Sequence, residues 1–331
     1  MPKHPNKSKQ RNPTKRTTAA TPTPLELVLP ATSANLGPAF DAAALAFGLH
    51  LKIHAHRATS NVFSIVATGR DAEICGQIQD HLIISTYCEV LQAEGKEVTP
   101  LALRIRNEIP IGKGCGSSAA ARLAGIALAV HCGGLEWNDS RIVGEAARRE
   151  HHPDNASACW MGGLTVARMS AEAEAQIACV EPKGRWPLLV VVPKESLSTE
   201  EARRVLPAQY SRADAVANLQ NSMLLLASFV KGRPDLLATA LEDRIHQPYR
   251  APLCPLLPCL EKLAGSRGIL GVALSGAGPS VLVFVDPRVP PKQAAVSVSA
   301  HVQRHGLTAE LLPTSITLKG GRHSPSWLRR H

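Results

Sequence analysis

Apolar residues follow two kinds of spacing along this chain, and together they predict a mixture of short strands and helices. Alternating or continuous apolar runs predict strands, and apolar residues that recur every three or four positions predict helices. The expected strands are 25–29, 45–53, 60–68, 101–109, 186–193, 269–274, 281–285 and 309–312, with one more in the glycine-broken segment after residue 160. The expected helices are 80–94, 119–131, 140–150, 213–230, 233–241 and 292–305.

The order of these elements indicates an α+β protein of two domains. At 331 residues the chain is long enough for two, since a domain usually holds ~100–200 residues. In the second half the order β-α-α-β-β-α-β suits a ferredoxin-like sheet with helices on one face. We place the domains at 25–175 and 176–318, with the boundary in the region 170–186.

The net charge of +10 is concentrated at the two ends of the chain. Residues 1–24 hold six lysines and arginines and no acid, and residues 319–331 hold four, so the body between them is neutral. We therefore expect two basic tails, of which the first is too polar and proline-rich to order. Because the folded body lacks a basic face, nucleic acid is not an expected partner.

Composition also narrows the expected location. No secretory signal follows the basic start, and no window reaches the ~18 apolar residues of a membrane span. The eight cysteines are scattered without C-x-x-C spacing, which is typical of reduced thiols. The sequence therefore predicts a cytoplasmic protein that does not enter a membrane.

A glycine-rich segment, IPIGKGCGSSAAA at 109–121, lies between a predicted strand and an alanine-rich helix. Glycine amides and the first turn of a helix can converge on a phosphate. The other interpretation is a tight turn in which Ser117 or Ser118 caps the helix. The segment has neither the Gly-Lys-Ser/Thr end of a Walker loop nor the spacing of the dinucleotide fingerprint.

Two polar clusters are further candidates for chemistry. The turn after Pro30 gathers Thr32, Ser33, Asn35 and Asp41, which suits either a capped loop or a substrate contact. The second cluster lies at the end of the predicted helix 140–150 and just after it, and consists of Glu145, Glu150, His151, His152, Asp154 and Asn155. It could bind a transition metal, end a helix, or hold a hard cation together with a polar ligand. The transition metal is disfavoured because no cysteine or further histidine stands at ligand spacing.

Four segments resemble, in sequence and in order, the motifs of the GHMP small-molecule kinases, and among these the homoserine kinases most closely. The resemblance implies two α+β domains, an N-terminal nucleotide-binding one and a C-terminal ferredoxin-like one. It also implies ATP and Mg²⁺ as cofactors and the side-chain hydroxyl of L-homoserine as the group phosphorylated, with a different small alcohol as the alternative. A homodimer is a further expectation. The segments are PATSANLGPAFD, PIGKGCGSSAAA, EHHPDNASACWMGGL and LSGAGPSVLVF, within residues 30–284.

The resemblance also assigns expected roles to single residues. Those expected to hold ATP are Pro110, Gly112, Lys113, Gly114, Cys115, Gly116, Ser117, Ser118 and Ala119. Ser118 and Glu150 are the expected Mg²⁺ ligands, with Glu145 as the second choice for the carboxylate. Those expected to hold the amino acid are Asn35, Asp41, His152, Asn155, Arg203, Arg250, Gly276 and Gly278, with Arg244 less secure.

Two interpretations of the chemistry stay open at this point. Asp41 is the candidate base, but phosphoryl transfer depends mainly on positioning and charge neutralisation, so Asp41 could serve only to position the substrate. Ala39 and His151 stand where the family usually has glycine. Ala39 is tolerable only if its φ is negative, and His151 adds a titratable ring beside Glu150.

Overall fold

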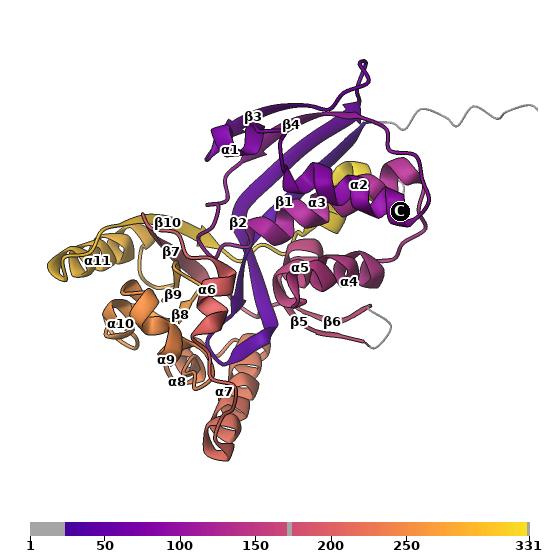
Figure 1. Cartoon of the computed structure of the whole chain (residues 1–331). Helices are drawn as coiled ribbons and strands as arrows, with labels where there is room; N and C mark the ends of the chain where they lie inside the picture. The colour runs from indigo at the N-terminus through magenta and orange to yellow at the C-terminus, as the bar shows by residue number, and fades with distance from the viewer. Residues whose placement is uncertain (1–23, 171–173, 330–331) are drawn as a thin grey trace, which may run out of the picture.

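The computed structural model describes residues 24–170 and 174–329, and it shows two α+β lobes (Figure 1). Residues 1–23 of the predicted first tail lie outside the described residues. The first lobe has strands β1 Leu25–Asn35, β2 Ala39–Arg57, β3 Ser64–Gly69, β4 Leu101–Asn107, β5 Leu164–Met169 and β6 Ala175–Val180, and helices α1 Ala72–Gly76, α2 Leu82–Ala93, α3 Ser117–Gly133, α4 Asp139–Glu150 and α5 Asp154–Met161.

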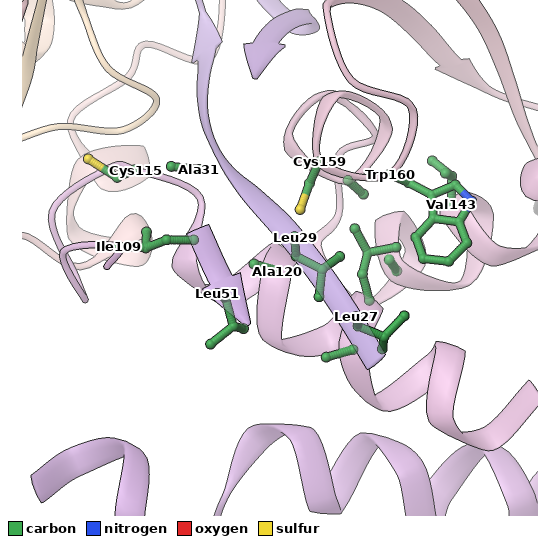
Figure 2. Close-up of a cluster of buried hydrophobic side chains, with 14 of the residues drawn as sticks. Leu27, Leu29, Ala31, Leu51, Ile109, Cys115, Ala120, Val143, Cys159 and Trp160 are labelled. Carbon is green, nitrogen blue, oxygen red and sulfur yellow. The ribbon is translucent and has the colours of Figure 1, made fainter. Parts of the chain in front are cut away.

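The long strand β2 organises the first sheet. The sheet has the order β3-β4-β2-β5-β6, and β1 pairs antiparallel with β2 over most of its length. Inward residues of β1 such as Leu27 and Leu29 meet α3 and α5, and Trp160 of α5 fills the space beside Val143 of α4 (Figure 2). The alanine-rich α3 is buried almost all round, which explains why it is apolar on every side.

The predicted break at Pro30 is wrong. β1 continues to Asn35, and the structure accommodates the proline at a register shift between Pro30 and Ala31. A bulge leaves one residue out of the ladder, so the missing amide hydrogen of proline costs little there. The turn shrinks to the few residues between Asn35 and Ala39.

The second lobe confirms the ferredoxin-like sheet, with antiparallel strands in the order β10-β7-β9-β8. The prediction that helices cover one face of this sheet only is wrong, because helices pack on both faces. Leu189 and Val191 of β7 face α10 and α11, whereas Phe284 of β9 meets Phe229 of α7 on the opposite face. The elements are β7 Pro187–Pro193, α6 Thr199–Arg204, α7 Arg212–Lys231, α8 Leu237–Ala240, α9 Gln247–Arg250, α10 Leu256–Glu261, β8 Ile269–Leu274, β9 Val281–Val285, α11 Pro291–Arg304, β10 Ala309–Ser315 and α12 Pro325–Leu328, with 3₁₀ turns at Pro234–Leu236, Ala251–Leu253 and Gly321–His323.

The chain changes from the first sheet to the second between Val180 and Pro187, within the boundary region 170–186 and after the division at 175/176. β6 pairs antiparallel with β5 and completes the edge of the first sheet. The chain enters the second sheet only at Pro187, because the hairpin partner of β6 lies in the first lobe.

The prediction that residues 319–331 form a basic tail is wrong for the described part of that segment. Trp327 of α12 is 4% exposed and packs edge-on against Trp160, with ring centroids 5.0 Å apart. Ser324 accepts a hydrogen bond from the amide of Val28 in β1, at 2.9 Å. Arg322 pairs with Asp139 at 2.7 Å, so one of the basic residues has an acidic partner in the first lobe.

Candidate active site

The glycine-rich segment forms a tight loop directly before α3. Gly112, Gly114 and Gly116 all have positive φ, at 68°, 76° and 72°, which residues with a side chain rarely adopt. A Cβ on Gly116 would lie 1.9 Å from the Thr32 hydroxyl, and one on Gly114 would lie 2.2 Å from the Ser275 carbonyl oxygen. The loop therefore needs glycine both for its backbone conformation and for its contacts with two other segments.

The N-terminus of α3 is left without a side-chain cap. Its N-cap residue is Gly116, and neither Ser117 nor Ser118 caps the helix. Among the described residues, the amides of Gly116, Ser117 and Ser118 donate to no protein acceptor. These amides and the helix dipole can bind an anion, and the alternative of a simple capped turn is excluded. We call residues 112–119 the glycine wall.

A hydroxyl–carboxylate pair stands beside the glycine wall. The Ser118 hydroxyl donates to Glu150 Oε1 at 2.6 Å, and Arg122 Nε donates to the same oxygen at 2.5 Å. Glu145, the second choice, is engaged elsewhere, because it accepts hydrogen bonds from Arg148 and Arg149. The structure thus brings Ser118 and Glu150 together and leaves Glu145 outside the cavity described below.

The polar cluster at the end of α4 continues into a further helix, α5, which begins at Asp154 and which the sequence analysis did not predict. His151 ends α4 with φ of 68°, at the place where the family usually has glycine. Ala39, the other departure, has no positive φ, so its methyl group causes no strain.

A buried imidazole–carboxylate pair lies at the start of α5. His152 Nδ1 is 2.6 Å from Asp154 Oδ1, and the two side chains are 8% and 1% exposed. Burial lowers the pKa of His152, but Asp154 and Asp41 outweigh burial and raise it above the ordinary value. The second oxygen of Asp154, Oδ2, is buried without a hydrogen-bond partner. An unpaired buried carboxylate oxygen favours a cationic or hydrogen-donating ligand.

The turn between β1 and β2 positions Asn35 and Asp41. Asn35 Oδ1 accepts from the Asp41 amide at 3.0 Å, and its Nδ2 donates to the Gly276 carbonyl at 2.9 Å. The Asp41 carboxylate receives two hydrogen bonds from Arg203 of α6, at 2.7 and 3.1 Å. This fork joins the two lobes across the cavity.

Arg250 of α9 lies deeper than Arg203 and is 1% exposed. Its Nε donates to the Ala202 carbonyl at 2.9 Å, and Nη1 donates to the Gly276 carbonyl at 3.3 Å. Burial, and then the charge of Arg203, lower the pKa of Arg250 to about 10. Arg250 therefore stays cationic at neutral pH in a position that favours an additional anion.

The second glycine segment, 275–279, lies directly against the glycine wall and contributes Gly276, Ala277 and Gly278 to the cavity described below. The Ser275 hydroxyl donates to the Gly114 carbonyl at 2.7 Å. Gly278 has φ of 91°, and a Cβ there would lie 2.7 Å from the Cys254 sulfur. The two glycine segments are thus held against each other by a direct hydrogen bond.

The residues of this site share one cavity of about 110 Å³. The eight residues expected with most weight to hold the amino acid line it, as do Ser118 and Glu150. Three of the expected ATP contacts do not, namely Pro110, Lys113 and Cys115, and Arg244 lines a different cavity. We call the charged part of the lining, made by Asp41, His152, Asp154, Arg203 and Arg250, the ionic wall. Lining residues to which the sequence analysis gave no role of their own are Ala34, Asp154, Leu197, Thr199 and Ala277.

A larger apolar cavity of about 610 Å³ adjoins the glycine wall. It shares Gly112, Ser117 and Ser118 with the smaller cavity and extends between α1, α2 and β4. Its lining includes Ile74, Ile83, Ile105, Ile109 and Ile111. An apolar pocket next to an anion site suits a molecule with a flat apolar part and a phosphate part.

Comparison with known proteins identifies the family. The GHMP kinases N terminal domain matches residues 81–163, and the GHMP kinases C terminal domain matches residues 225–304. Homoserine kinase of Solibacter usitatus is 44% identical over 263 residues, which cover 78% of this chain and 84% of that protein. The chain belongs to the homoserine kinase family.

Other members and solved structures agree with this assignment. Homoserine kinase of Synechocystis sp. is 36% identical over 294 residues, covering 88% of this chain and 95% of that protein. The crystal structure of homoserine kinase from Cytophaga hutchinsonii superposes with a TM-score of 0.77 at 21% identity, covering 90% of this chain and 96% of that one. Mevalonate kinase of L. major, in complex with R-mevalonate, has a TM-score of 0.68 at 13% identity, covering 89% and 97%. At these identities the two structures establish the shared fold.

Proposed function

We propose that this protein transfers the γ-phosphoryl group of ATP to the side-chain hydroxyl of L-homoserine and releases O-phospho-L-homoserine, an intermediate of threonine biosynthesis. One observation carries the proposal: a single cavity has an anion-binding glycine wall on one side and an ionic wall with two arginines and a buried carboxylate on the other. The 44% identity to a homoserine kinase supports the same substrate.

In this proposal ATP lies along the glycine wall. The amides of Gly116, Ser117 and Ser118 hold the phosphates, and the adjoining apolar cavity accepts the nucleoside. Lys113 makes its side-chain contact away from the cavity, because its Nζ donates to the Lys194 carbonyl at 2.5 Å. The backbone of the loop, rather than this lysine, therefore supplies most of the phosphate contacts.

Ser118 and Glu150 are the proposed Mg²⁺ ligands. A hard cation prefers oxygen ligands, and the hydroxyl and carboxylate already lie 2.6 Å apart at the edge of the glycine wall. Mg²⁺ would neutralise charge on the phosphates, and Glu150 would then exchange its bond to Arg122 for the metal.

The ionic wall is the proposed site for the amino acid. Arg203 and Arg250 face the cavity and can bind the α-carboxylate, and the unpaired Asp154 Oδ2 suits the α-ammonium group. Since Asp41 pairs with Arg203 in this structure, the substrate must share or replace that fork. Asp41 then lies free to accept the hydroxyl proton or to orient the hydroxyl toward the phosphate.

We also propose that the protein works in the cytoplasm. None of the eight cysteines, all of which lie in the described part of the chain, forms a disulfide bond, and the seven that are not exposed fit a reducing compartment. Among the described helices, none has the length and apolar character needed to cross a bilayer. The homodimer stays a prediction.

A coupled assay of ADP release tests the proposed function. We expect Mg²⁺-dependent turnover with L-homoserine, and at least a ~100-fold lower kcat/KM with the corresponding amino alcohol that lacks the carboxylate, since two arginines would lose their anion. Mevalonate serves as the control alcohol. Turnover of mevalonate or of the carboxylate-free alcohol, together with none of homoserine, would favour a different small alcohol as the substrate.

A further inference from the structure

Two helices on the outer face of the second sheet bring a cysteine and two histidines together. Cys259 lies on α10, His301 lies on α11, and His305 directly follows α11. The Cys259 sulfur and one nitrogen of each imidazole lie within 4.8 Å of one another. The cluster belongs to the second lobe, and none of its residues lines the cavity between the glycine wall and the ionic wall.

The cysteine is buried without a partner. Cys259 is 5% exposed, and its sulfur makes no hydrogen bond to any atom of the residues that the structure describes. Burial raises the pKa of the thiol, and the nearby Lys262 opposes that effect. A thiol in such surroundings keeps its proton until a metal ion displaces it.

Backbone carbonyls orient both imidazoles. His301 Nε2 lies 2.9 Å from the Cys259 carbonyl oxygen, and His305 Nδ1 lies 2.9 Å from the His301 carbonyl oxygen. The ring centroids are 4.4 Å apart, as expected of two histidines four positions apart on one helical face. Bonds from histidine to backbone carbonyls are the usual way in which metal-binding imidazoles are held in place.

We propose that Cys259, His301 and His305 bind a divalent transition metal of borderline softness, with Zn²⁺ as the ion of best fit. One thiolate and two imidazoles suit Zn²⁺ and do not suit Mg²⁺, which prefers oxygen ligands. A tetrahedral ion with ~2.3 Å to sulfur and ~2.0 Å to nitrogen holds its ligand atoms less than ~4 Å apart, so small rotations of the side chains complete the site.

Binding would link α10 to α11 and release one proton from the thiol to solvent. His301 is buried but His305 is exposed, so the site opens toward solvent on the side of His305, where water can take the fourth position. α10 follows α9, which carries Arg250, after a short 3₁₀ turn. An ion bound to α10 would therefore also hold the C-terminal end of the segment that runs from Arg250 to α10.

Metal titration of the full-length protein tests this inference. With Co²⁺ as the probe, wild-type protein should develop a thiolate-to-metal charge-transfer band, and Zn²⁺ should abolish that band by displacement. Cys259→Ser should remove the band, and His305→Ala should weaken Zn²⁺ binding at least ~100-fold in competition with a chromophoric chelator, since the loss of a ligand should exceed the 10–100-fold cost of losing an outer partner.

Two control variants identify the ligands. Cys179→Ser removes the exposed cysteine on β6, and His56→Ala removes a histidine on β2, so both should bind Zn²⁺ as the wild type does. Zn²⁺ should also raise the unfolding temperature of the wild type and not that of Cys259→Ser. A missing charge-transfer band in the wild type, or equal Zn²⁺ affinity of wild type and Cys259→Ser, would overturn the proposal. Neither result depends on kinase activity, so this test and that of the proposed function fail separately.

Discussion

The glycine wall and the ionic wall face the same cavity but are built in opposite ways. The glycine wall is one continuous segment that presents backbone amides, and apart from Lys113 its side chains are absent or small. The ionic wall assembles side chains from β2, the start of α5, α6 and α9. Four of its charged groups form the pairs His152–Asp154 and Arg203–Asp41, and backbone carbonyls hold Arg250. Backbone donors bind any phosphate, whereas charged side chains in fixed positions select one partner. We therefore expect the glycine wall to determine the affinity for ATP and the ionic wall to determine the affinity for the amino acid.

The largest expected effect lies beside the glycine wall, at Glu150. Glu150→Ala removes a proposed metal ligand, so kcat/KM should fall on the order of 10²–10³-fold, the usual cost of losing one group that stabilises transferred charge. Steady-state ADP release across a Mg²⁺ titration measures it. Glu145→Ala is the matched control, since Glu145 pairs with Arg148 and Arg149 outside the cavity. Near-normal kcat in Glu150→Ala would transfer the metal role to another group.

Gly116→Ala should distort the glycine wall alone. The new Cβ would meet the Thr32 hydroxyl at 1.9 Å, in a backbone conformation with φ of 72°. Strain of ~1–3 kcal/mol corresponds to about a 5–150-fold rise in KM for ATP if the loop must deform to bind. Gly134→Ala is the control, because its φ is 60° and a Cβ there meets no atom within 4 Å. Equal kinetics in both variants would contradict a phosphate site here.

Arg203→Ala should weaken the ionic wall without affecting ATP. Losing a forked bond to a carboxylate costs ~1.5–3 kcal/mol, so KM for homoserine should rise about 10–100-fold while KM for ATP stays unchanged. Arg204→Ala is the neighbouring control, since Arg204 is exposed and pairs, within the described part of the chain, with Glu200 alone. The comparison of the two walls would fail if both Michaelis constants rose together.

Asp41→Asn separates positioning from base catalysis within the ionic wall. If Asp41 positions the substrate, KM for homoserine should rise roughly tenfold and kcat should change little, because the amide keeps one oxygen acceptor. Initial rates at saturating ATP measure both constants. A large fall in kcat with KM unchanged would assign Asp41 the role of base.

The smallest expected effect is a pH dependence of stability from the His152–Asp154 pair. Folding raises the pKa of His152, so the pair stabilises the protein fully below the ordinary histidine pKa of 6.5 and loses that contribution as pH rises through the raised folded-state value. The free energies of unfolding of wild type and His152→Gln, measured with urea, should therefore differ most at about pH 6 and progressively less toward about pH 9. A constant difference over this range would indicate that folding does not shift the pKa of His152.

The two walls also differ in how well the sequence predicted them. The glycine wall was predicted from one segment, because a run of glycines before an alanine-rich helix determines its own backbone. Motif resemblance predicted Arg203 and Arg250, but no local pattern could show that Asp41 and Arg203 meet across the cavity. Asp154 was part of a candidate cluster but received no role of its own, because its unpaired oxygen is a property of burial that appears only after α5 packs.

Similar limits apply to the fold. Helices with clear periodicity and the second sheet were predicted correctly, because their signals lie within short windows. The break at Pro30 was wrong because a bulge can absorb a proline. The packing of residues 319–329 against the first lobe could not be predicted. Trp327 stands alone among basic residues and gives no periodic signal, and its partner Trp160 lies far away in the sequence.

The way in which the chain returns to the first lobe sets an order of assembly during synthesis. Thr317 bonds to Ala46 and Gly163, and Trp327 completes the core beside Trp160, yet both are translated after the entire second sheet. When the other residues of the first lobe leave the ribosome, its core therefore still lacks residues 317–328, and it is complete only once these have emerged.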